Sequence, residues 1–267
     1  MKKLIICSLF ACLLISCGGG GGGDAQGDPS SGDDIWSPAV RTSWTIQLNG
    51  ALNTSYDVDV YDIDLFDTSS ADIAALKSAG RKVICYFSAG SYENWRDDKD
   101  DFPAAVIGDA LVGWAGENWL DIRSEDVKTI MAARMDLAVS KGCDAVDPDN
   151  VDGYSNVSGF PLTAADQLAY NTWLAQTAHA KGLAVGLKND LDQITDLVNY
   201  FDFAVNESCY DYSECGDLTP FTDDNKPVFG IEYAATTDVF CDKVNTLDFN
   251  FLYMNTDLDG TLRQACR

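Results

Sequence analysis

Histidine is almost absent from this chain: His179 is the only one among 267 residues. It stands near the end of a predicted helix, in the stretch TAHAKG, where a surface position is expected. The scarcity excludes most catalytic schemes in which histidine activates a serine or cysteine nucleophile. Zinc sites draw on histidine and on CxxC pairs, and the sequence has no CxxC pair, so we predict neither a metal nor another cofactor.

Basic residues are also scarce. The chain has 18 Lys and Arg against 42 Asp and Glu, a formal net charge of −24. Nucleic acid is excluded as a partner, because phosphate recognition needs clustered basic side chains. The acidity permits electrostatic attraction of a cationic partner or substrate, although an acidic solvated surface that only confers solubility is an equal alternative.

A long hydrophobic run is found only at the N-terminus. Residues 4–15 are apolar, follow two lysines and are too few to span a bilayer, which is typical of a signal peptide. The next stretch, LISC, resembles a bacterial lipobox with Cys17 as the lipidated residue; an ordinary secretory signal is the alternative. We therefore expect a signal peptide over 1–16, a lipidated flexible tether over 17–37 and one domain over 38–267. The protein would be exported and held at the bacterial membrane or cell surface by this lipid anchor alone.

Cysteine is better represented, and six of the nine cysteines follow the tether. An even number in an exported chain suggests disulfides. The plausible pairs are Cys209 with Cys215 in a short loop and Cys241 with Cys266 near the C-terminus. Cys85 and Cys143 lie in apolar runs, and we interpret them as buried thiols.

Short β-branched runs alternate with amphipathic stretches over most of the chain. Three predicted helices, at 70–80, 124–142 and 163–182, each end in a glycine that is followed directly by a buried strand. This repeat indicates βα units around a parallel sheet. The eight predicted strands are residues 44–50, 58–64, 82–90, 143–150, 183–190, 201–208, 227–234 and 249–256. Eight strands predict a single-domain α/β fold, the (β/α)8 TIM barrel, with an open doubly wound sheet as the alternative.

The segment after the third predicted strand, residues 91–124, is long for a βα loop. Loops of this length are usually functional or disordered. Four aromatic residues favour an ordered wall beside a cleft: Tyr92, Trp95, Trp114 and Trp119.

Polar side chains gather at the carboxyl ends of the predicted strands, which in a barrel form the catalytic face. They are Asp62 and Asp64, Tyr86 and Ser88, Asp147, Asp149 and Asn150, Lys188, Asn189 and Asp190, Asn206 and Glu207, and Glu232 and Tyr233. Paired carboxylates without histidine suit glycoside hydrolysis, and the aromatic residues of the insertion suit stacking on sugar rings. The stretch DPDNVDG is superficially similar to an EF-hand loop, but Ser158 stands where calcium needs a glutamate. A cation site of another kind remains an alternative.

Six stretches in consistent order resemble glycoside hydrolase family 114, the endo-α-1,4-polygalactosaminidases. They are VYDIDLFDT, KVICYFSAGSYENWR, WLDIRS, GCDAVDPDNVDGY, GLKND and FAVNESC, all within residues 44–233. The resemblance implies a TIM barrel that hydrolyses α-1,4-linked, galactosamine-containing polysaccharide. It places the family's catalytic pair on Asp149 and Glu207. Asp147 stands where many relatives have Glu, which implies a supporting role, and the family more often has NEQ than the NES found here.

On this basis we expect Asp149 to act as nucleophile and Glu207 as general acid/base, with retention or inversion set by their separation. The candidate substrate-binding residues are Asp62, Asp64, Tyr86, Asp147, Asn150, Lys188, Asn189 and Glu232. Asp62, Asp64 and Glu232 are expected to bind the amino groups of a cationic polymer, since a desolvated ammonium needs partners. Two alternatives are a non-catalytic carbohydrate-binding surface lipoprotein on the same barrel and an aldolase that forms a Schiff base through Lys188.

Overall fold

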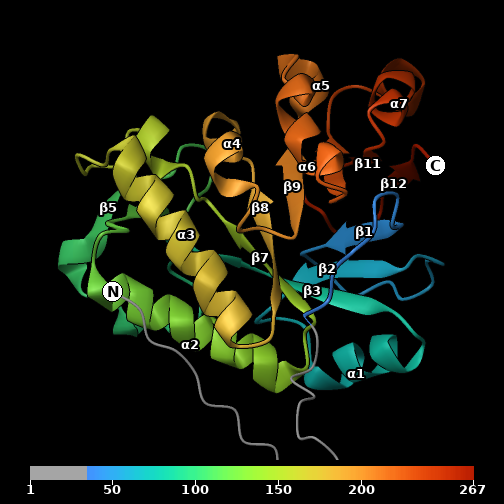
Figure 1. Ribbon diagram of the computed structural model, residues 1–267. Coiled ribbons are helices and arrows are strands. Elements are labelled where there is room, and N and C mark those ends of the chain that lie inside the picture. Colours follow the sequence, from blue (N-terminus) through green and yellow to red (C-terminus); the bar gives the residue numbers. More distant parts are fainter. Residues whose placement is uncertain (1–34) are drawn as a thin grey trace, which may run out of the picture. The chain divides into compact units, whose positions relative to one another are not determined.

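The computed structural model describes residues 35–267 (Figure 1). The predicted signal peptide (1–16), the lipidation site Cys17 and the tether up to residue 34 lie outside the described residues. Ile35 and Trp36 pack against the core, and the Trp36 ring centroid lies 6.3 Å from that of Phe203. The packed chain therefore begins before the expected boundary at residue 38. Within the described part, none of the helices is both long and apolar enough to cross a membrane.

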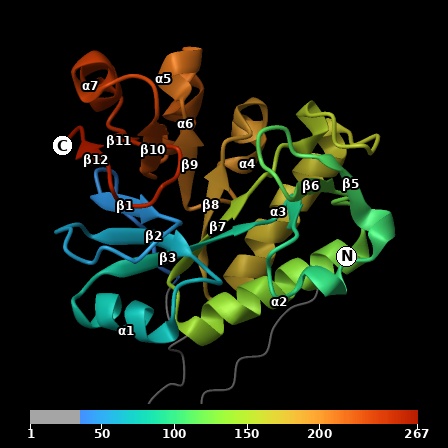
Figure 2. The same ribbon diagram turned by 180° about the vertical axis from the view of Figure 1, so that it is seen from behind.

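Eight parallel strands follow one another in sequence order around a curved sheet (Figures 1 and 2). They are β1 (Trp44–Gln47), β2 (Val60–Asp64), β3 (Lys82–Ser88), β7 (Ala145–Asp149), β8 (Ala184–Lys188), β9 (Phe203–Glu207), β10 (Val228–Glu232) and β11 (Asn250–Met254). All eight predicted strands are present, each shorter than expected. This order and direction are those of the predicted α/β barrel.

The barrel closes between its first and eighth strands by means other than a parallel ladder. Among residues 35–267 no ladder joins β1 to β11, and β12 (Arg263–Ala265) instead pairs antiparallel with β11. Across the gap the Trp44 indole donates to the Asn250 carbonyl (2.8 Å), and Arg263 donates to the Trp44 carbonyl (2.6 Å). Side chains thus hold this seam together.

The helices cover the outer side of the sheet (Figures 1 and 2). They are α1 (Ser70–Ser78), α2 (Glu125–Lys141), α3 (Ala164–Ala180), α4 (Ile194–Leu197), α5 (Cys209–Tyr212), α6 (Thr219–Asp223) and α7 (Thr237–Thr246). Short 3₁₀ turns lie at Lys99–Asp101, Ala104–Val106, Gly153–Ser155, Leu191–Gln193 and Cys215–Leu218. Thr163 and Asp166 form a capping box at the start of α3, and Gly142 ends α2 in a left-handed conformation, as the sequence predicted.

Alternation along each strand separates the two faces of the sheet. One set of residues points into the barrel, where Phe203, Phe229 and Trp44 form an apolar plug with ring centroids 5.0–5.6 Å apart. Position 230, inside a strand, requires glycine because a Cβ there would lie 2.0 Å from the Phe251 ring. The inward positions change from apolar to polar toward the carboxyl ends of the strands: Ala145 is followed by Asp147 and then Asp149.

The insertion after β3 is ordered, as predicted. Its three strands, β4 (Ser91–Glu93), β5 (Ile107–Ala110) and β6 (Glu117–Leu120), form an antiparallel sheet in the order β4-β6-β5. Buried Arg134 of α2 anchors it by donating to the Ser88 carbonyl at 2.7 Å and to both carboxylate oxygens of Asp98 at 2.8 and 2.9 Å. A charged residue inside α2 thus fixes the wall above the barrel.

Three disulfides are formed. Cys209–Cys215 and Cys241–Cys266 are the predicted pairs. The interpretation of Cys85 and Cys143 as thiols is wrong, because these two are bonded to each other with Cα atoms 6.1 Å apart. The two cysteines are 58 residues apart in the sequence, and they come close in space because β3 pairs with β7.

Candidate active site

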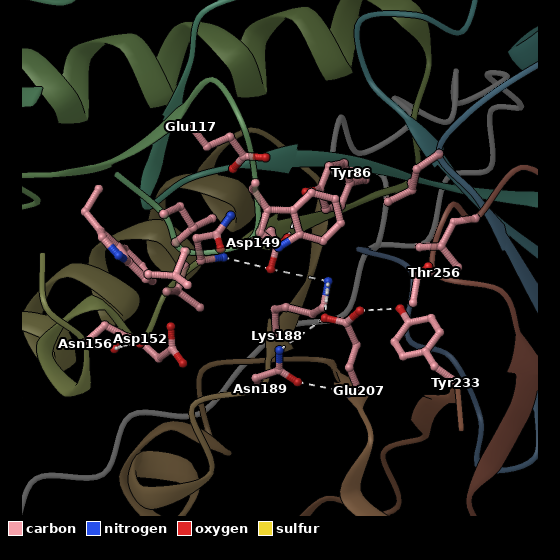
Figure 3. Close-up of a pocket in the computed structure, with 18 residues that line it drawn as sticks. Tyr86, Glu117, Asp149, Asp152, Asn156, Lys188, Asn189, Glu207, Tyr233 and Thr256 are labelled. Atoms are coloured by element: carbon pink, nitrogen blue, oxygen red, sulfur yellow. Dashed lines mark hydrogen bonds and ion pairs between the residues drawn. The ribbon is translucent and has the colours of Figure 1, made fainter. Parts of the chain in front are cut away.

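A pocket of about 240 Å³ opens at the carboxyl ends of the strands (Figure 3). Side chains from seven of the parallel strands, or from the residues just after them, reach it, and the insertion closes one side. The polar lining residues are Tyr86, Glu117, Asp149, Asn150, Asp152, Asn156, Lys188, Asn189, Glu207, Tyr233 and Thr256, and Trp114 and Trp119 add aromatic surface. The predicted face of the barrel and the predicted aromatic wall therefore meet in one site.

Asp149 and Glu207 converge on a single ammonium group. Lys188 Nζ lies 3.3 Å from Asp149 Oδ1 and 3.6 Å from Glu207 Oε2 (Figure 3). Placed end to end, these two distances limit the separation of the two carboxylate oxygens to about 7 Å, close to the spacing of glycosidase carboxylates. The two predicted catalytic groups thus face one another across a gap of the size that the chemistry needs.

Asp149 is held as an acceptor on both oxygens. The Tyr86 hydroxyl donates to Oδ2 at 2.8 Å, and the Asn150 backbone N–H donates to Oδ1 at 2.8 Å. Burial, followed by the charge of Asp149, raises the pKa of Tyr86 well above its usual value, so this hydroxyl keeps its proton and remains a donor. With Lys188 as third partner, both oxygens of Asp149 are held in place.

Glu207 is held less completely and is more open to solvent. Its Oε1 accepts a short hydrogen bond from the Tyr233 hydroxyl, and its Oε2 accepts a long one of 3.4 Å from Asn189 Nδ2. The same Asn189 accepts from the Glu207 backbone N–H at 3.0 Å. The side chain of Glu207 is 30% exposed, compared with 18% for Asp149, so Glu207 has the better route for proton exchange with water.

Lys188 is buried among three carboxylates, since Asp147 Oδ2 also lies 3.7 Å from its Nζ. Burial alone would lower the pKa of Lys188, but Asp149, Glu207 and Asp147 raise it well above its usual value. The side chain is therefore an ammonium at neutral pH. A Schiff base needs an unprotonated amine, so the site does not favour the aldolase alternative.

Asp62 and Asp147 lie one layer below the pocket. Both are fully buried, and none of their carboxylate oxygens has a hydrogen-bond partner in the described part of the chain. Burial raises the pKa of Asp147 to about 7 against the opposing effect of Lys188, and it raises that of Asp62 well above the usual range. Neither residue lines the pocket, contrary to the prediction that both bind substrate, and Asp147 instead lies against Lys188.

Asp64 is also engaged within the protein. It forms two hydrogen bonds to Arg96, of 3.0 and 2.6 Å, and accepts from the Phe66 backbone N–H at 2.8 Å. The guanidinium of Arg96 also bonds Glu93 of the insertion, at 2.8 Å. The Asp64 carboxylate thus holds the insertion against the barrel. The sequence had instead predicted that it binds an amino group of the substrate.

Glu232 faces away from the pocket. In β10 the inward residues are Phe229 and Ile231, with Tyr233 just after the strand, so Glu232 points outward, where it is fully buried. Its Oε1 accepts from the Tyr210 backbone N–H at 2.7 Å, and burial raises its pKa to about 7. The predicted amine-binding role is wrong for Glu232. Strand alternation is the signal that would have selected Tyr233 in its place.

Replacing Glu232 by Gln is expected to raise the melting temperature at pH 8 by roughly 3–6 °C and to change it little at pH 5. An ordinary Glu pKa is about 4.3, so the native state binds the extra proton between that pH and about 7. Stability therefore falls as pH rises through this window, and an uncharged Gln removes that fall. Thermal unfolding from pH 5 to 8 measures it, with exposed Glu125→Gln as control. Parallel curves for Glu232→Gln and wild type would contradict the assignment.

Backbone geometry at the strand ends aims the functional side chains. Asn150, Asn189 and Ser208 each have a positive φ, of 60°, 51° and 63°, directly after β7, β8 and β9. Such residues are uncommon outside glycine and cluster at functional sites. Gly90 allows the β7 turn to approach, because a Cβ there would lie 1.6 Å from the Asn150 carbonyl oxygen.

Comparisons with known proteins identify the family of this chain. The model of glycoside hydrolase family GH114 matches residues 26–267. The structure of Ega3 from Aspergillus fumigatus, solved in complex with galactosamine, matches with a TM-score of 0.84 and 45% identity over 87% of this chain and 98% of that one. A Deinococcus radiodurans protein is 26% identical over 276 residues, 87% of this chain and 88% of its own length.

The glycoside hydrolase domain of PelA from Pseudomonas aeruginosa shares the fold, with a TM-score of 0.67 and 12% identity over 84% of this chain and 98% of that domain. The family match covers all of the described residues, including both carboxylates paired through Lys188. The chain belongs to glycoside hydrolase family GH114.

Proposed function

We propose that this protein hydrolyses α-1,4-linked polysaccharide that contains galactosamine, with Asp149 as nucleophile and Glu207 as general acid/base. The observation that carries the proposal is the convergence of both carboxylates on Lys188 inside one pocket. Family membership supports the reaction class, and the galactosamine bound to the similar Ega3 supports the sugar. A strongly acidic chain suits a cationic polymer.

The division of roles follows from the two environments. Asp149, fixed by two hydrogen-bond donors and the Lys188 ammonium, attacks the anomeric carbon while protonated Glu207 gives its proton to the departing glycosidic oxygen. The glycosyl-enzyme ester is then cleaved by a water molecule that gives a proton to Glu207. Retaining enzymes place their carboxyls about 5–5.5 Å apart and inverting enzymes about 6.5–9.5 Å apart. The limit of about 7 Å between Asp149 Oδ1 and Glu207 Oε2 includes the retaining spacing, on which the two-step route is proposed.

The pocket continues in both directions along the face of the barrel. On one side it shares Trp114, Glu207 and Tyr233 with a hollow of about 490 Å³, and on the other it shares Tyr86, Glu117 and Leu258 with one of about 590 Å³. The acidic residues of these hollows are Asp152, Asp190, Asp192, Glu214 and Asp217 on the first side and Asp64, Asp67, Glu93 and Asp257 on the second. A groove that extends beyond the catalytic pair on both sides suits cleavage within a chain.

The test is product analysis on partially deacetylated α-1,4-linked galactosamine polymer. We expect new reducing ends and, by mass spectrometry, a ladder of oligosaccharides before monosaccharide accumulates. Release of monosaccharide alone would contradict internal cleavage. If the protein bound the polymer but left every α-linked hexosamine polymer intact, the non-catalytic carbohydrate-binding alternative would replace this proposal. The presence and mutual geometry of both carboxylates argue against that alternative.

We also propose export and attachment to the bacterial membrane through a lipid on Cys17. The proposal rests on the lipobox-like sequence LISC and on three disulfides, which form in oxidising compartments. Wild-type protein is expected in the membrane fraction, and a Cys17→Ser variant in the soluble fraction. Equal partitioning of the two proteins would remove the support for a lipid anchor.

A further inference from the structure

Glu117, on the insertion, lines the catalytic pocket and has no role in the mechanism proposed above. It is the first residue of β6 and lines the central pocket (Figure 3). It also lines the extension of that pocket, which Trp95 borders. Its exposed fraction is only 8%, so this charge is largely removed from bulk water although it faces a cavity. A carboxylate in that position needs a partner.

A chain of hydroxyl groups fixes the Glu117 carboxylate relative to the nucleophile. Ser91 Oγ donates to Glu117 Oε2 at 2.7 Å, and Ser91 is in turn 2.7 Å from Ser88 Oγ. Asn150 Nδ2 donates to the same Ser88 Oγ at 2.9 Å, and the Asn150 backbone binds Asp149. Glu117 is therefore a built part of the site with one oxygen held by the protein.

No cation of the described chain pairs with this carboxylate. The neighbouring Glu93 is bonded to Arg96 at 2.8 Å and lies 3.4 Å from Arg134, while Lys188 is shared by three other carboxylates. Within residues 35–267, no Lys or Arg nitrogen comes within 4.0 Å of Glu117, and its Oε1 accepts no hydrogen bond. Burial raises the pKa of Glu117, the Ser91 hydroxyl lowers it, Asp149 raises it further, and the charge of Arg96 has a smaller lowering effect. Arg96 forms its own bonds to Asp64 and Glu93, so the free Oε1 of Glu117 is open to a cation that enters with a ligand.

We infer that Glu117 binds the ammonium group of a galactosamine unit at or beside the cleavage point and thereby selects deacetylated units. The inference rests on the proposed function. An ammonium would supply both the charge and the hydrogen bond that Oε1 lacks. An N-acetyl group is neutral and larger, so it would leave the buried carboxylate unpaired, which disfavours acetylated units at this position.

The test compares two α-1,4-linked oligosaccharides of equal length, one fully deacetylated and one N-acetylated in alternate units. For Glu117→Gln we expect kcat/KM on the deacetylated substrate to fall about 10–100-fold, mainly through KM. The value for the partly acetylated substrate should stay the same or rise. Glu117→Asp, which keeps the charge, should restore part of the preference. Glu125→Gln, the same chemical change at an exposed position of α2 that lines none of these hollows, serves as the matched control and should leave the ratio unchanged.

Two results would overturn the inference. An equal loss on both substrates would make Glu117 a positioning residue that acts through Ser91 and Asn150. No loss on either would make its carboxylate irrelevant to recognition. Retained activity on the partly acetylated substrate shows that the variant is folded. Failure of the wild-type protein to cleave either substrate would instead contradict the proposed function, so the two failures are distinguishable.

Discussion

Asp149→Asn and Glu207→Gln are each expected to lower kcat/KM on galactosamine polymer by about 10³–10⁴-fold. The first change replaces a charged nucleophile by a neutral amide, and the second removes the proton needed by the departing oxygen. Both amides fill the same space, so the Tyr86 and Tyr233 hydroxyls keep an acceptor and the fold is retained. Reducing-end release measures activity, and thermal unfolding verifies that stability is unchanged.

Azide distinguishes the two roles. With Asp149→Ala, azide can enter the vacated space and attack the sugar directly, so the product of an α-linked substrate is the β-azide. With Glu207→Ala and an aryl α-glycoside that has a good leaving group, the glycosyl-enzyme still forms and azide displaces it, so the product is the α-azide. Anomeric coupling in proton NMR identifies each product. Exchanged products would reverse the assignment, and Asp152→Ala, in the same pocket but not paired with Lys188, should give neither.

Removing the central cation is expected to have the second largest effect. Lys188→Met keeps most of the side-chain volume but leaves Asp147, Asp149 and Glu207 without their shared partner. Breaking a buried ionic group from one side typically costs about 3–5 kcal/mol, which for a domain of this size corresponds to a fall of roughly 10 °C in melting temperature. The kcat/KM value should fall by about 10²-fold or more, because Lys188 no longer fixes the positions of Asp149 and Glu207 relative to each other.

The pH dependence of that loss tests the cause. The pKa of Asp147 is already raised to about 7, and removing Lys188 takes away the group that lowers it. The native variant would then hold more protons than the unfolded chain over a wider range, so its stability falls more steeply between pH 4 and pH 8 or so. At pH 5 the deficit should be small. Lys188→Met combined with Asp147→Asn should recover stability at pH 8 without recovering activity, and a deficit independent of pH would contradict this account.

Local sequence patterns predicted a large part of the fold. Short β-branched runs located all eight parallel strands, and a helix that ends in glycine precedes three of them, since capping and alternation are properties of neighbouring residues. The aromatic content of residues 91–124 predicted an ordered wall, which the structure shows as three strands. The family resemblance indicated Asp149 and Glu207, and the tertiary structure brings both to Lys188.

The misassigned residues share a physical cause. Glu232 and Asp62 were assigned to the site because both lie near strand ends, but β10 turns Glu232 outward and β2 places Asp62 one layer too deep. Asp64 has the correct depth, yet Arg96 from the insertion neutralises it. The apolar runs around Cys85 and Cys143 suggest buried thiols. Their contact depends on the pairing of β3 with β7, which local sequence does not reveal.

Local patterns suffice to predict the strands, the acidity of the chain and the carboxylates at the strand ends, because these depend on each residue and its near neighbours. Folding in three dimensions is needed to establish which carboxylates share one cavity, which are bonded to arginine and which, like Glu117, have no ion-pair partner within residues 35–267. These outcomes depend on the depth and direction of side chains contributed by strands far apart in the chain. Closure of the barrel sets both at once.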